Sequence, residues 1–128
     1  MRIQAPVFVN YNNAAKLLFQ YKFDGDEPGT MRTVEEKIII FSCMSAEEAF
    51  VSANARGIGD QRSFVNDEGT PGHFEFVGIV DLMHLGIETD EDEVWYDIRK
   101  MKDPMSRKEL LLPEKKKLSA FVWESSLK

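Results

Sequence analysis

Two histidines and one cysteine have the clearest capacity for acid–base, metal or thiol chemistry in this sequence. His73 and Glu75 are two positions apart, so a strand places them on one face as two potential metal ligands. Transition-metal sites usually need three or four ligands, and His84 falls on the opposite face of the same run. We therefore predict no metal site. Cys43 ends an apolar run, where a lone cysteine is usually an inert core residue rather than a nucleophile.

The glutamates of one predicted strand are the next candidates. Glu35 and Glu36 are adjacent, so their side chains face opposite sides of the sheet. The inward carboxylate needs a cationic partner such as Arg32, Arg62 or Arg107, because a buried unpaired charge is very costly. This inward glutamate is the best single candidate for a functional residue, and a structural salt bridge is the alternative.

One aromatic side chain, Trp95, completes the candidate set, because aromatic residues near a sheet face or edge can supply affinity for a partner. The predicted binding residues are Glu35, Glu36, Arg62, His73, Glu75 and Trp95. The sequence contains no phosphate-binding glycine loop, no nucleophile elbow and no zinc-protease or paired-cysteine motif. We therefore predict no catalytic residue and no cofactor, and a binding protein rather than an enzyme.

Hydrophobic patterns predict the strands that position these residues. Residues 15–23 alternate apolar and polar side chains, which is typical of a strand with one buried face. Residues 24–30 are rich in turn-forming residues, and residues 34–41 contain three consecutive isoleucines, which favour a central strand buried on both faces. The two strands are expected to form an antiparallel hairpin with a long connection.

A helix follows this hairpin. Ser45 and Glu48 have the spacing of a capping box, in which each side chain binds the backbone of the other residue. Small apolar residues at helical spacing extend the helix over Ser45–Arg56, and Gly57 is predicted to end it in a left-handed conformation. We expect this helix to pack across one face of the sheet.

Two more strand-like runs, residues 62–65 and 73–83, surround a strong turn signal. Simple alternation over the second run places Phe74, Phe76, Val80 and Leu82 on one face, and His73, Glu75, Val77, Ile79 and Met83 on the other. Gly78 in its middle indicates a β-bulge or the close approach of a neighbouring side chain. Residues 94–99 are predicted to form a final short strand.

The predicted fold is α+β, a mainly antiparallel sheet of four to five strands with one helix packed on a face and a C-terminal appendage. Residues 1–112 are expected to form a single domain. Residues 113–128 are predicted to be a basic tail that docks either on a neighbouring subunit or back onto the acidic body. Its spacing of apolar residues favours an amphipathic helix, and an extended conformation of residues 118–123 is the alternative.

Composition and charge limit the classes of function. The chain has 128 residues, of which 43% are hydrophobic, and one cysteine; these values suit one globular domain in a reducing cytoplasm. No apolar run is long enough to span a membrane, and the N-terminus does not resemble a signal peptide. Residues 1–98 hold 7 Lys and Arg against 18 Asp and Glu, whereas residues 99–128 hold 9 against 4. Because the main body is acidic, we do not expect it to bind nucleic acid.

The order of several short motifs resembles a bacterial protein family. These motifs are Ala14–Phe19, Glu35–Ile38, Ser45–Ala49, Phe64–Gly69, Phe76–Leu82, Glu93–Tyr96 and Pro104–Arg107. Together they are similar to the family known as domain of unknown function 4288, over residues 13–113. The resemblance implies a small bacterial α+β domain and assigns no catalytic residue.

The sequence leaves two functions open. The first is a cytoplasmic binding protein that captures a basic protein, as an immunity protein or antitoxin captures a toxin, since complementary charge speeds such encounters. The second is a small-molecule or nucleotide-binding domain, with possible minor enzymatic activity, that uses a carboxylate on the sheet face. The C-terminal tail could in addition join copies of the chain into a homo-oligomer.

Overall fold

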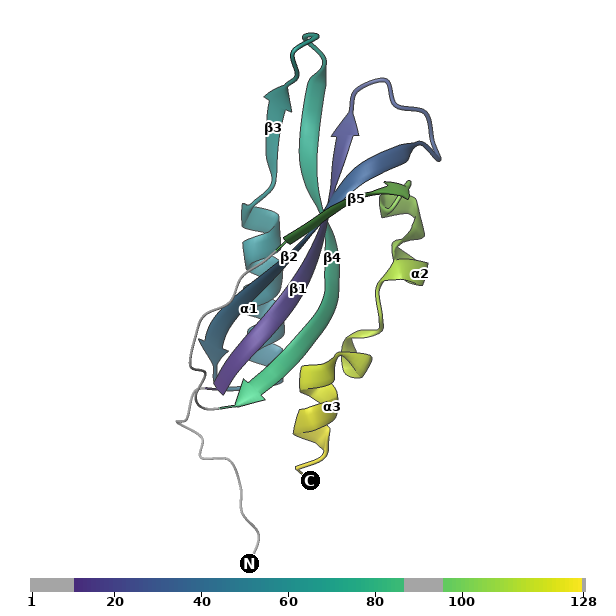
Figure 1. Cartoon of the computed structure of the whole chain (residues 1–128). Coiled ribbons are helices and arrows are strands. Elements are labelled where there is room, and N and C mark those ends of the chain that lie inside the picture. Colours follow the sequence, from purple (N-terminus) through teal and green to yellow (C-terminus); the bar gives the residue numbers. More distant parts are fainter. Residues whose placement is uncertain (1–10, 87–95, 128) are drawn as a thin grey trace, which may run out of the picture.

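The computed structural model describes residues 11–86 and 96–127. In these ranges the elements are β1 (Tyr11–Phe23), β2 (Met31–Cys43), α1 (Ala46–Gly59), β3 (Arg62–Val65), β4 (Pro71–Gly86), β5 (Tyr96–Lys102), the 3-10 turn η1 (Met105–Arg107), α2 (Lys108–Leu111), the 3-10 turn η2 (Lys115–Lys117) and α3 (Ser119–Ser125). The strands form one sheet in the order β3-β4-β1-β2-β5, with every neighbouring pair antiparallel (Figure 1). The predicted α+β fold with a five-stranded antiparallel sheet is therefore confirmed.

β1 and β2 form the predicted hairpin at the centre of the sheet. Both strands extend beyond their predicted bounds, and Tyr11 at the start of β1 pairs with Cys43 at the end of β2. Ile39 is buried at 7% exposure on the side of α1, whereas Ile38 and Ile40 on the other face are half-buried. The burial of the isoleucine run on both faces is thus less complete than predicted.

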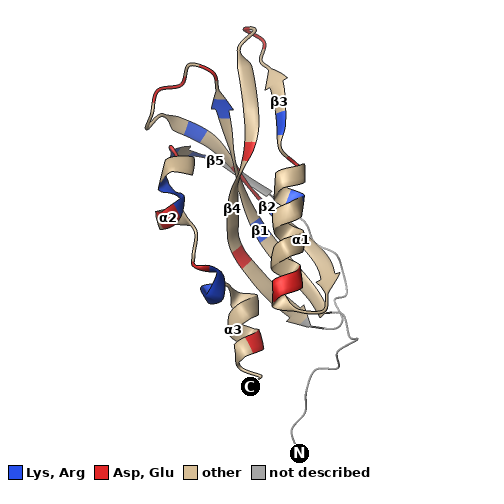
Figure 2. Ribbon diagram, turned by 180° about the vertical axis from the view of Figure 1, so that it is seen from behind, with Lys and Arg blue, Asp and Glu red and all other residues tan. Residues whose placement is uncertain are grey.

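The face of the sheet that carries α1 holds the larger part of the core. Leu17 and Phe19 of β1 point to this face and are fully buried, which for side chains of this size stabilises the fold by about 1.5–3 kcal/mol each. α1 contributes the buried side chains of Ala46, Ala49 and Ala53. Their small size lets the helix lie close against the sheet (Figure 2).

β4 departs from simple alternation because it contains bulges. The register between β4 and β1 shifts by one residue at Val80 and again at Val77. Each of these two residues of β4 therefore has no opposite residue in β1. As a result, Ile79 joins the core on the α1 side, and Val80 packs against the smaller core on the second face. The predicted faces of Ile79 and Val80 are therefore wrong, whereas the bulge indicated by Gly78 is confirmed.

α1 begins as predicted and ends later. Ser45 Oγ accepts a hydrogen bond of 3.1 Å from the backbone N–H of Glu48, which confirms the N-terminal cap. The helix continues to Gly59, so the predicted left-handed stop at Gly57 is wrong. Gly57 is instead needed for close packing, because a Cβ added there would lie 2.5 Å from the ring of Phe76.

The chain after β5 passes from one face of the sheet to the other; we call residues 103–127 the C-terminal strap. Its first part covers the second face, where Met105 and Leu111 pack against the small core around Leu18. Leu112 then lies directly over Gly78, where any added side-chain atom would collide with it. This contact supplies the close approach that a glycine inside a strand indicates.

The second part of the C-terminal strap lies on the α1 side, and α3 is the predicted C-terminal helix. Leu118 and Ala120 are buried at 2% and 1% exposure in the core beneath α1 and α3. Lys115 Nζ lies 2.7 Å from a carboxylate oxygen of Glu47, so the basic run meets the acidic start of α1 (Figure 2). The strap thus docks on its own chain, which is one of the two outcomes expected for the tail. No described helix is long and apolar enough to cross a membrane.

Candidate functional site: a polar pocket on the sheet

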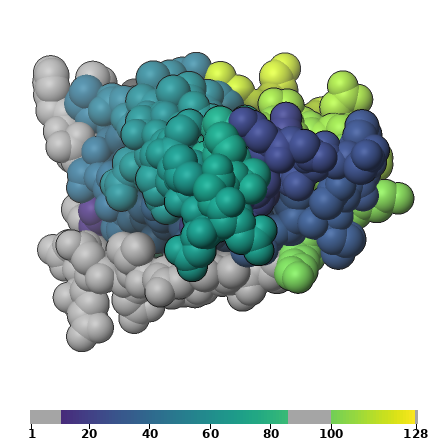
Figure 3. Space-filling model, turned by 90° about the horizontal axis from the view of Figure 1, so that it is seen from above, coloured from purple at the N-terminus to yellow at the C-terminus, as the bar shows by residue number. Residues whose placement is uncertain are grey.

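A polar pocket lies on the second face of the sheet, at the end where β1 turns into β2. Its volume is about 370 Å³, and it is lined by Gln20, Lys22, Asp26, Pro28, Arg32, Glu75, Asp103, Met105 and Ser106; we call it the hairpin pocket. β1, β2 and β4 supply one part of the lining, and the β1–β2 connection and the start of the strap supply the rest. Figure 3 shows this end of the molecule, where the dark blue β1–β2 connection lies beside the green chain that follows β5.

Gln20 lies deepest in the hairpin pocket and is 1% exposed. Its Nε2 donates a hydrogen bond of 2.7 Å to Oε1 of Glu75. Because an ionised carboxylate only accepts hydrogen bonds, Glu75 fixes the orientation of the amide and leaves Oε1 of Gln20 for another donor. This buried oxygen has no hydrogen-bond partner among the described residues. An unsatisfied buried acceptor costs about 1–3 kcal/mol.

Arg32 is the second buried polar residue of the pocket, at 6% exposure. Its Nη1 lies 2.6 Å from Oδ1 of Asp103, which anchors the guanidinium. Its Nε is 3.6 Å from Oδ2 of Asp26, which is too far for a hydrogen bond, and has no other partner in the described part of the chain. Arg32 Nε is therefore a buried donor without a hydrogen-bond partner in the pocket lining.

Asp103 joins the strap to the β1–β2 connection. Its Oδ2 accepts a hydrogen bond of 3.0 Å from the backbone N–H of Gly29, and its own N–H donates to the carbonyl of Thr30. The Gly29 hydrogen bond, assisted by Ser106 and Arg32, holds the pKa of Asp103 below its ordinary value. Its φ of 30° is unusual for a residue other than glycine, and such backbone strain is found preferentially at functional sites.

The hairpin pocket is suited to recognition by hydrogen bonding. Its lining combines one unpartnered acceptor and one unpartnered donor. Its formal charge is −1, because Lys22 and Arg32 are outnumbered by Asp26, Glu75 and Asp103. Its lining contains neither histidine nor cysteine. Elsewhere in the described ranges, no three His, Cys, Asp or Glu side chains are placed to hold a metal ion.

The strands that build the pocket lie in the part of the chain that matches the model of a protein family. The model of the family described as Domain of unknown function (DUF4288) matches residues 13–95. The chain belongs to the DUF4288 family. The match includes Gln20, Arg32 and Glu75 of the hairpin pocket, whereas Asp103 lies beyond it. Comparison of this DUF4288 chain with curated proteins and with solved structures gives no match.

One predicted binding residue of this DUF4288 domain, Glu75, lines the hairpin pocket. His73 lies on the same face, as predicted, but its ring is held outside the pocket lining. Its Nε2 lies 2.9 Å from Oδ1 of Asp24, and its Nδ1 lies 2.9 Å from Oγ of Ser63. His84 pairs with Asn13 on the opposite face, so the two histidines do not converge.

The other predicted residues of the DUF4288 domain lie elsewhere. The guanidinium of Arg62 stacks 4.3 Å from the ring centroid of Phe74 on the α1 side, and Arg62 also lines a separate pocket at the β3–β4 edge together with the predicted residues His73 and Glu75. Glu35 also faces α1, and its partner is Lys37 at 4.0 Å rather than any of the three predicted arginines. Glu36 faces the opposite side and is outside the pocket lining. Trp95 lies outside the described residues.

Sequence reasoning missed Gln20, Arg32 and Asp103 as members of one site. A polar residue at an even position of an alternating strand is expected to face water, whereas Gln20 is 1% exposed. The sequence indicates Arg32 only as a possible partner for a glutamate. Asp103 precedes a proline, which favours turns, and this is the one local signal for its unusual backbone.

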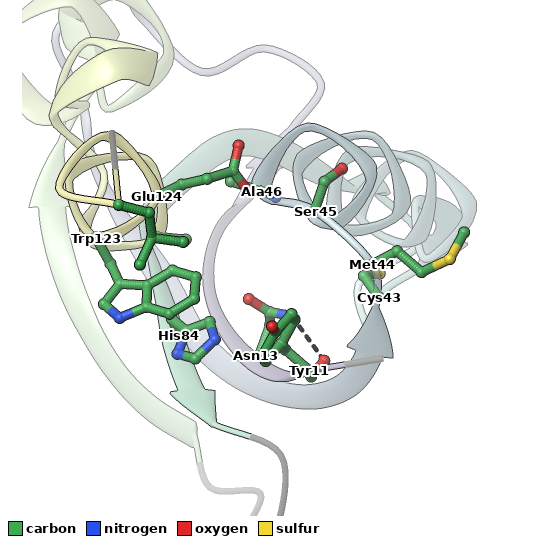
Figure 4. Close-up of a pocket in the computed structure, with 11 residues that line it drawn as sticks. Tyr11, Asn13, Cys43, Met44, Ser45, Ala46, His84, Trp123 and Glu124 are labelled. Carbon is green, nitrogen blue, oxygen red and sulfur yellow. Dashed lines mark hydrogen bonds between the residues drawn. The ribbon is translucent and has the colours of Figure 1, made fainter. Parts of the chain in front are cut away.

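A second pocket of about 190 Å³ lies at the other end of the DUF4288 sheet, where α3 meets the start of α1 (Figure 4). We call it the aromatic pocket. The ring of His84 stacks on Trp123 with 3.4 Å between centroids, and Tyr11 meets Trp123 edge-on. Glu124 Oε2 accepts a hydrogen bond of 2.7 Å from the first backbone N–H of α1, on Ala46. These contacts hold α3 against the sheet and the start of α1.

The aromatic pocket contains a thiol and an imidazole, and burial shifts the pKa of both. Burial raises the pKa of Cys43, which therefore favours the unreactive thiol. Burial also lowers the pKa of His84, although the carboxylate of Glu124 opposes this effect. His84 Nε2 has no partner in the described part of the chain. Cys43 is 2% exposed, as expected of a core residue.

Proposed function

We propose that this DUF4288 chain is a small-molecule-binding domain and that the hairpin pocket is its binding site. The observation that carries the proposal is that Gln20 and Arg32, two deeply buried residues of the pocket lining, each have a hydrogen-bonding atom without a partner among the described residues. Folded proteins leave few buried polar atoms unpaired. Two of them in one cavity support a site that is completed by a bound molecule.

The proposal corresponds to the second function that the sequence leaves open, in which a carboxylate on the sheet face takes part in binding. Glu75 is that carboxylate in the hairpin pocket. It orients the amide of Gln20 through Nε2, which leaves Oε1 without a partner among the described residues. The volume of the pocket, about 370 Å³, is within the range typical of small-molecule sites.

Capture of a basic protein is the other function that the sequence leaves open, and it remains a prediction. Part of the acidic surface that motivates it already contacts the chain's own basic strap, because Lys115 binds Glu47 and lies 4.5 Å from the ring centroid of Phe50. This internal contact favours the small-molecule function. Affinity pull-down from the native host with mass spectrometry tests protein capture, and recovery of no basic protein would count against it.

A chemical-shift titration of the full chain tests the proposed function. The probes are benzamide, benzoate, benzamidine and glucose, which cover uncharged, anionic and cationic molecules that fit a pocket of this size. At least one of them is expected to shift the backbone amides of Gln20, Glu75 and Ser106 in a saturable way. The proposal is wrong if none of the four perturbs these residues.

A further inference from the structure

We infer that the ligand of the hairpin pocket is an uncharged molecule that carries a carboxamide or lactam group, and this inference rests on the proposed binding function. The two free atoms in the pocket are of opposite kinds. Gln20 Oε1 needs a donor, and Arg32 Nε needs an acceptor. The bound group must therefore donate and accept at the same time.

The strand register places Gln20 and Arg32 close together on one face of the hairpin. Gln20 pairs with Val34 across the β1–β2 hairpin, and Arg32 precedes Val34 by two residues on the same face of β2. Gln20 and Arg32 are thus diagonal neighbours, whose Cα atoms in an antiparallel pair are typically about 7–8 Å apart. An amide offers its N–H and C=O as separate atoms along one edge. The N–H and C=O of one amide can therefore hydrogen-bond to two side chains in this arrangement.

Charge and hydrogen-bonding capacity argue against the other simple classes of ligand. A carboxylate only accepts and would leave Oε1 of Gln20 unsatisfied, and the formal charge of −1 in the pocket opposes any anion. An ammonium or amidinium group only donates, so it would leave Nε of Arg32 unsatisfied and place a second cation beside that guanidinium. An amide is uncharged and satisfies both atoms through two separate groups, whereas a hydroxyl donates and accepts through one oxygen.

A single ordered water is the main structural alternative, because water also donates and accepts. The pocket volume of about 370 Å³ far exceeds the space that one water occupies, which is about 30 Å³ in the liquid. Met105 and Pro28 provide apolar contact for the remainder of a larger molecule. The pocket thus has room for a ligand as well as atoms that recognise it.

Four compounds that share a benzene ring test the inference on the full-length chain. Benzamide is expected to bind in the hairpin pocket with a Kd on the order of 1 mM, as for a small fragment. Benzoate, which lacks the donor, and benzamidine, which lacks the acceptor, are expected to bind at least about tenfold more weakly. N,N-dimethylbenzamide, which is uncharged and keeps only the acceptor, should lose affinity by a similar factor.

Two matched variants test whether benzamide binds in the hairpin pocket. Gln20→Met removes the free acceptor and is expected to weaken benzamide binding at least about tenfold. Gln61→Met makes the same substitution outside the hairpin pocket, where Gln61 accepts a hydrogen bond from the backbone of Phe76, and should leave the affinity unchanged. Glu75→Gln removes the negative charge and frees the amide of Gln20 to turn. It should therefore reduce the ratio of the Kd for benzoate to the Kd for benzamide.

The outcomes separate this inference from the proposed function. If no probe perturbs the pocket, both fail. If benzoate, benzamidine or glucose binds there as tightly as benzamide, the pocket is a binding site and the amide assignment is wrong. Equal binding of benzamide and its dimethyl derivative would also overturn the assignment, and this comparison on the unmodified chain holds even if Gln20→Met does not fold.

Discussion

The imidazole of His84 lies face to face with the indole of Trp123, with an angle of 16° between the ring planes. This stack joins the end of β4 to α3 and is the principal aromatic contact between the sheet and the C-terminal strap in the described part of the chain. It places a titratable group in the docking surface of a helix. The stability of that docking should therefore depend on pH.

Acidification is expected to weaken the docking of α3. Burial lowers the pKa of His84 below its ordinary value of 6.5, so the unfolded chain takes up the proton before the folded chain does. The stabilising contribution of the neutral ring is fully present above pH 6.5 and is lost as the pH falls through the lower pKa of the folded state. The ring protons of His84 should titrate with a midpoint below 6.5. A midpoint at or above that value would contradict this assignment.

Gly57→Ala is expected to destabilise the protein even though alanine favours helices. The added methyl group would meet the ring of Phe76, and overpacking of this kind costs about 1–3 kcal/mol. Gly59→Ala is the control, because no atom lies within 4 Å of a Cβ at that position of the same helix. It should be neutral or stabilise the fold by about 0.5–1 kcal/mol. Urea denaturation of both variants measures the difference, and equal effects would refute the packing explanation.

Asp103→Asn should lower the melting temperature and reduce the loss of stability that the protein undergoes as the pH falls. Asparagine tolerates a positive φ, so the substitution mainly removes the charge that binds Arg32. In the unmodified chain the lowered pKa of Asp103 stabilises the fold above its ordinary pKa of 3.8, and this contribution is lost as the pH falls through the folded value. Melting curves over an acidic pH series test this. Asp103→Ala, which also disfavours the backbone conformation, should melt at a lower temperature than the asparagine variant.

Cys43→Ala should retain probe binding at the hairpin pocket and lose on the order of 1 kcal/mol of stability, as for a small truncation in the core. The thiol is buried, burial raises its pKa, and its hydrogen-bonding contact is with Ser52. A thiol reagent should accordingly react slowly with the folded chain and rapidly after unfolding. Loss of binding at an unchanged melting temperature would instead assign Cys43 a functional role.

Truncation tests whether residues 113–128 are separable from the domain. Deletion of residues 114–128 is expected to leave a folded sheet with a similar far-ultraviolet dichroism and a lower melting temperature, because Leu118 is buried at 2% exposure in the core. Leu118→Ala in the full chain should cost about 2–5 kcal/mol. Sedimentation of the full and truncated chains tests whether the tail also promotes association. A truncated chain that does not fold would show that the boundary at residue 113 is wrong.

Features that depend on neighbouring residues in the sequence could be predicted. The β1–β2 hairpin follows from alternation on either side of a turn-rich segment, and the cap at Ser45 follows from its spacing to Glu48. The bulge at Gly78 is also a local signal. In each case the residues that determine the structure lie within one element or its immediate connection.

Features that depend on distant packing could not be predicted in the same way. Gly57 has the residue type of a helix stop, and only the ring of Phe76 on β4 shows why glycine is needed. The faces of Ile79 and Val80 depend on register shifts against β1, which alternation within β4 does not report. The hairpin pocket combines residues from three strands and the strap, so neither the burial of Gln20 nor its free oxygen has a local signature.

The C-terminal strap has a consequence for the order of events during synthesis. Residues that cover both faces of the sheet, including Leu112 and Leu118, are translated after every described strand. The ribosome therefore delivers the strands β1 to β5 before it delivers the segment that shields Gly78 and completes the core beneath α3. Until residue 118 emerges, the nascent sheet presents apolar surface on both sides, which is the condition under which chaperones bind growing chains.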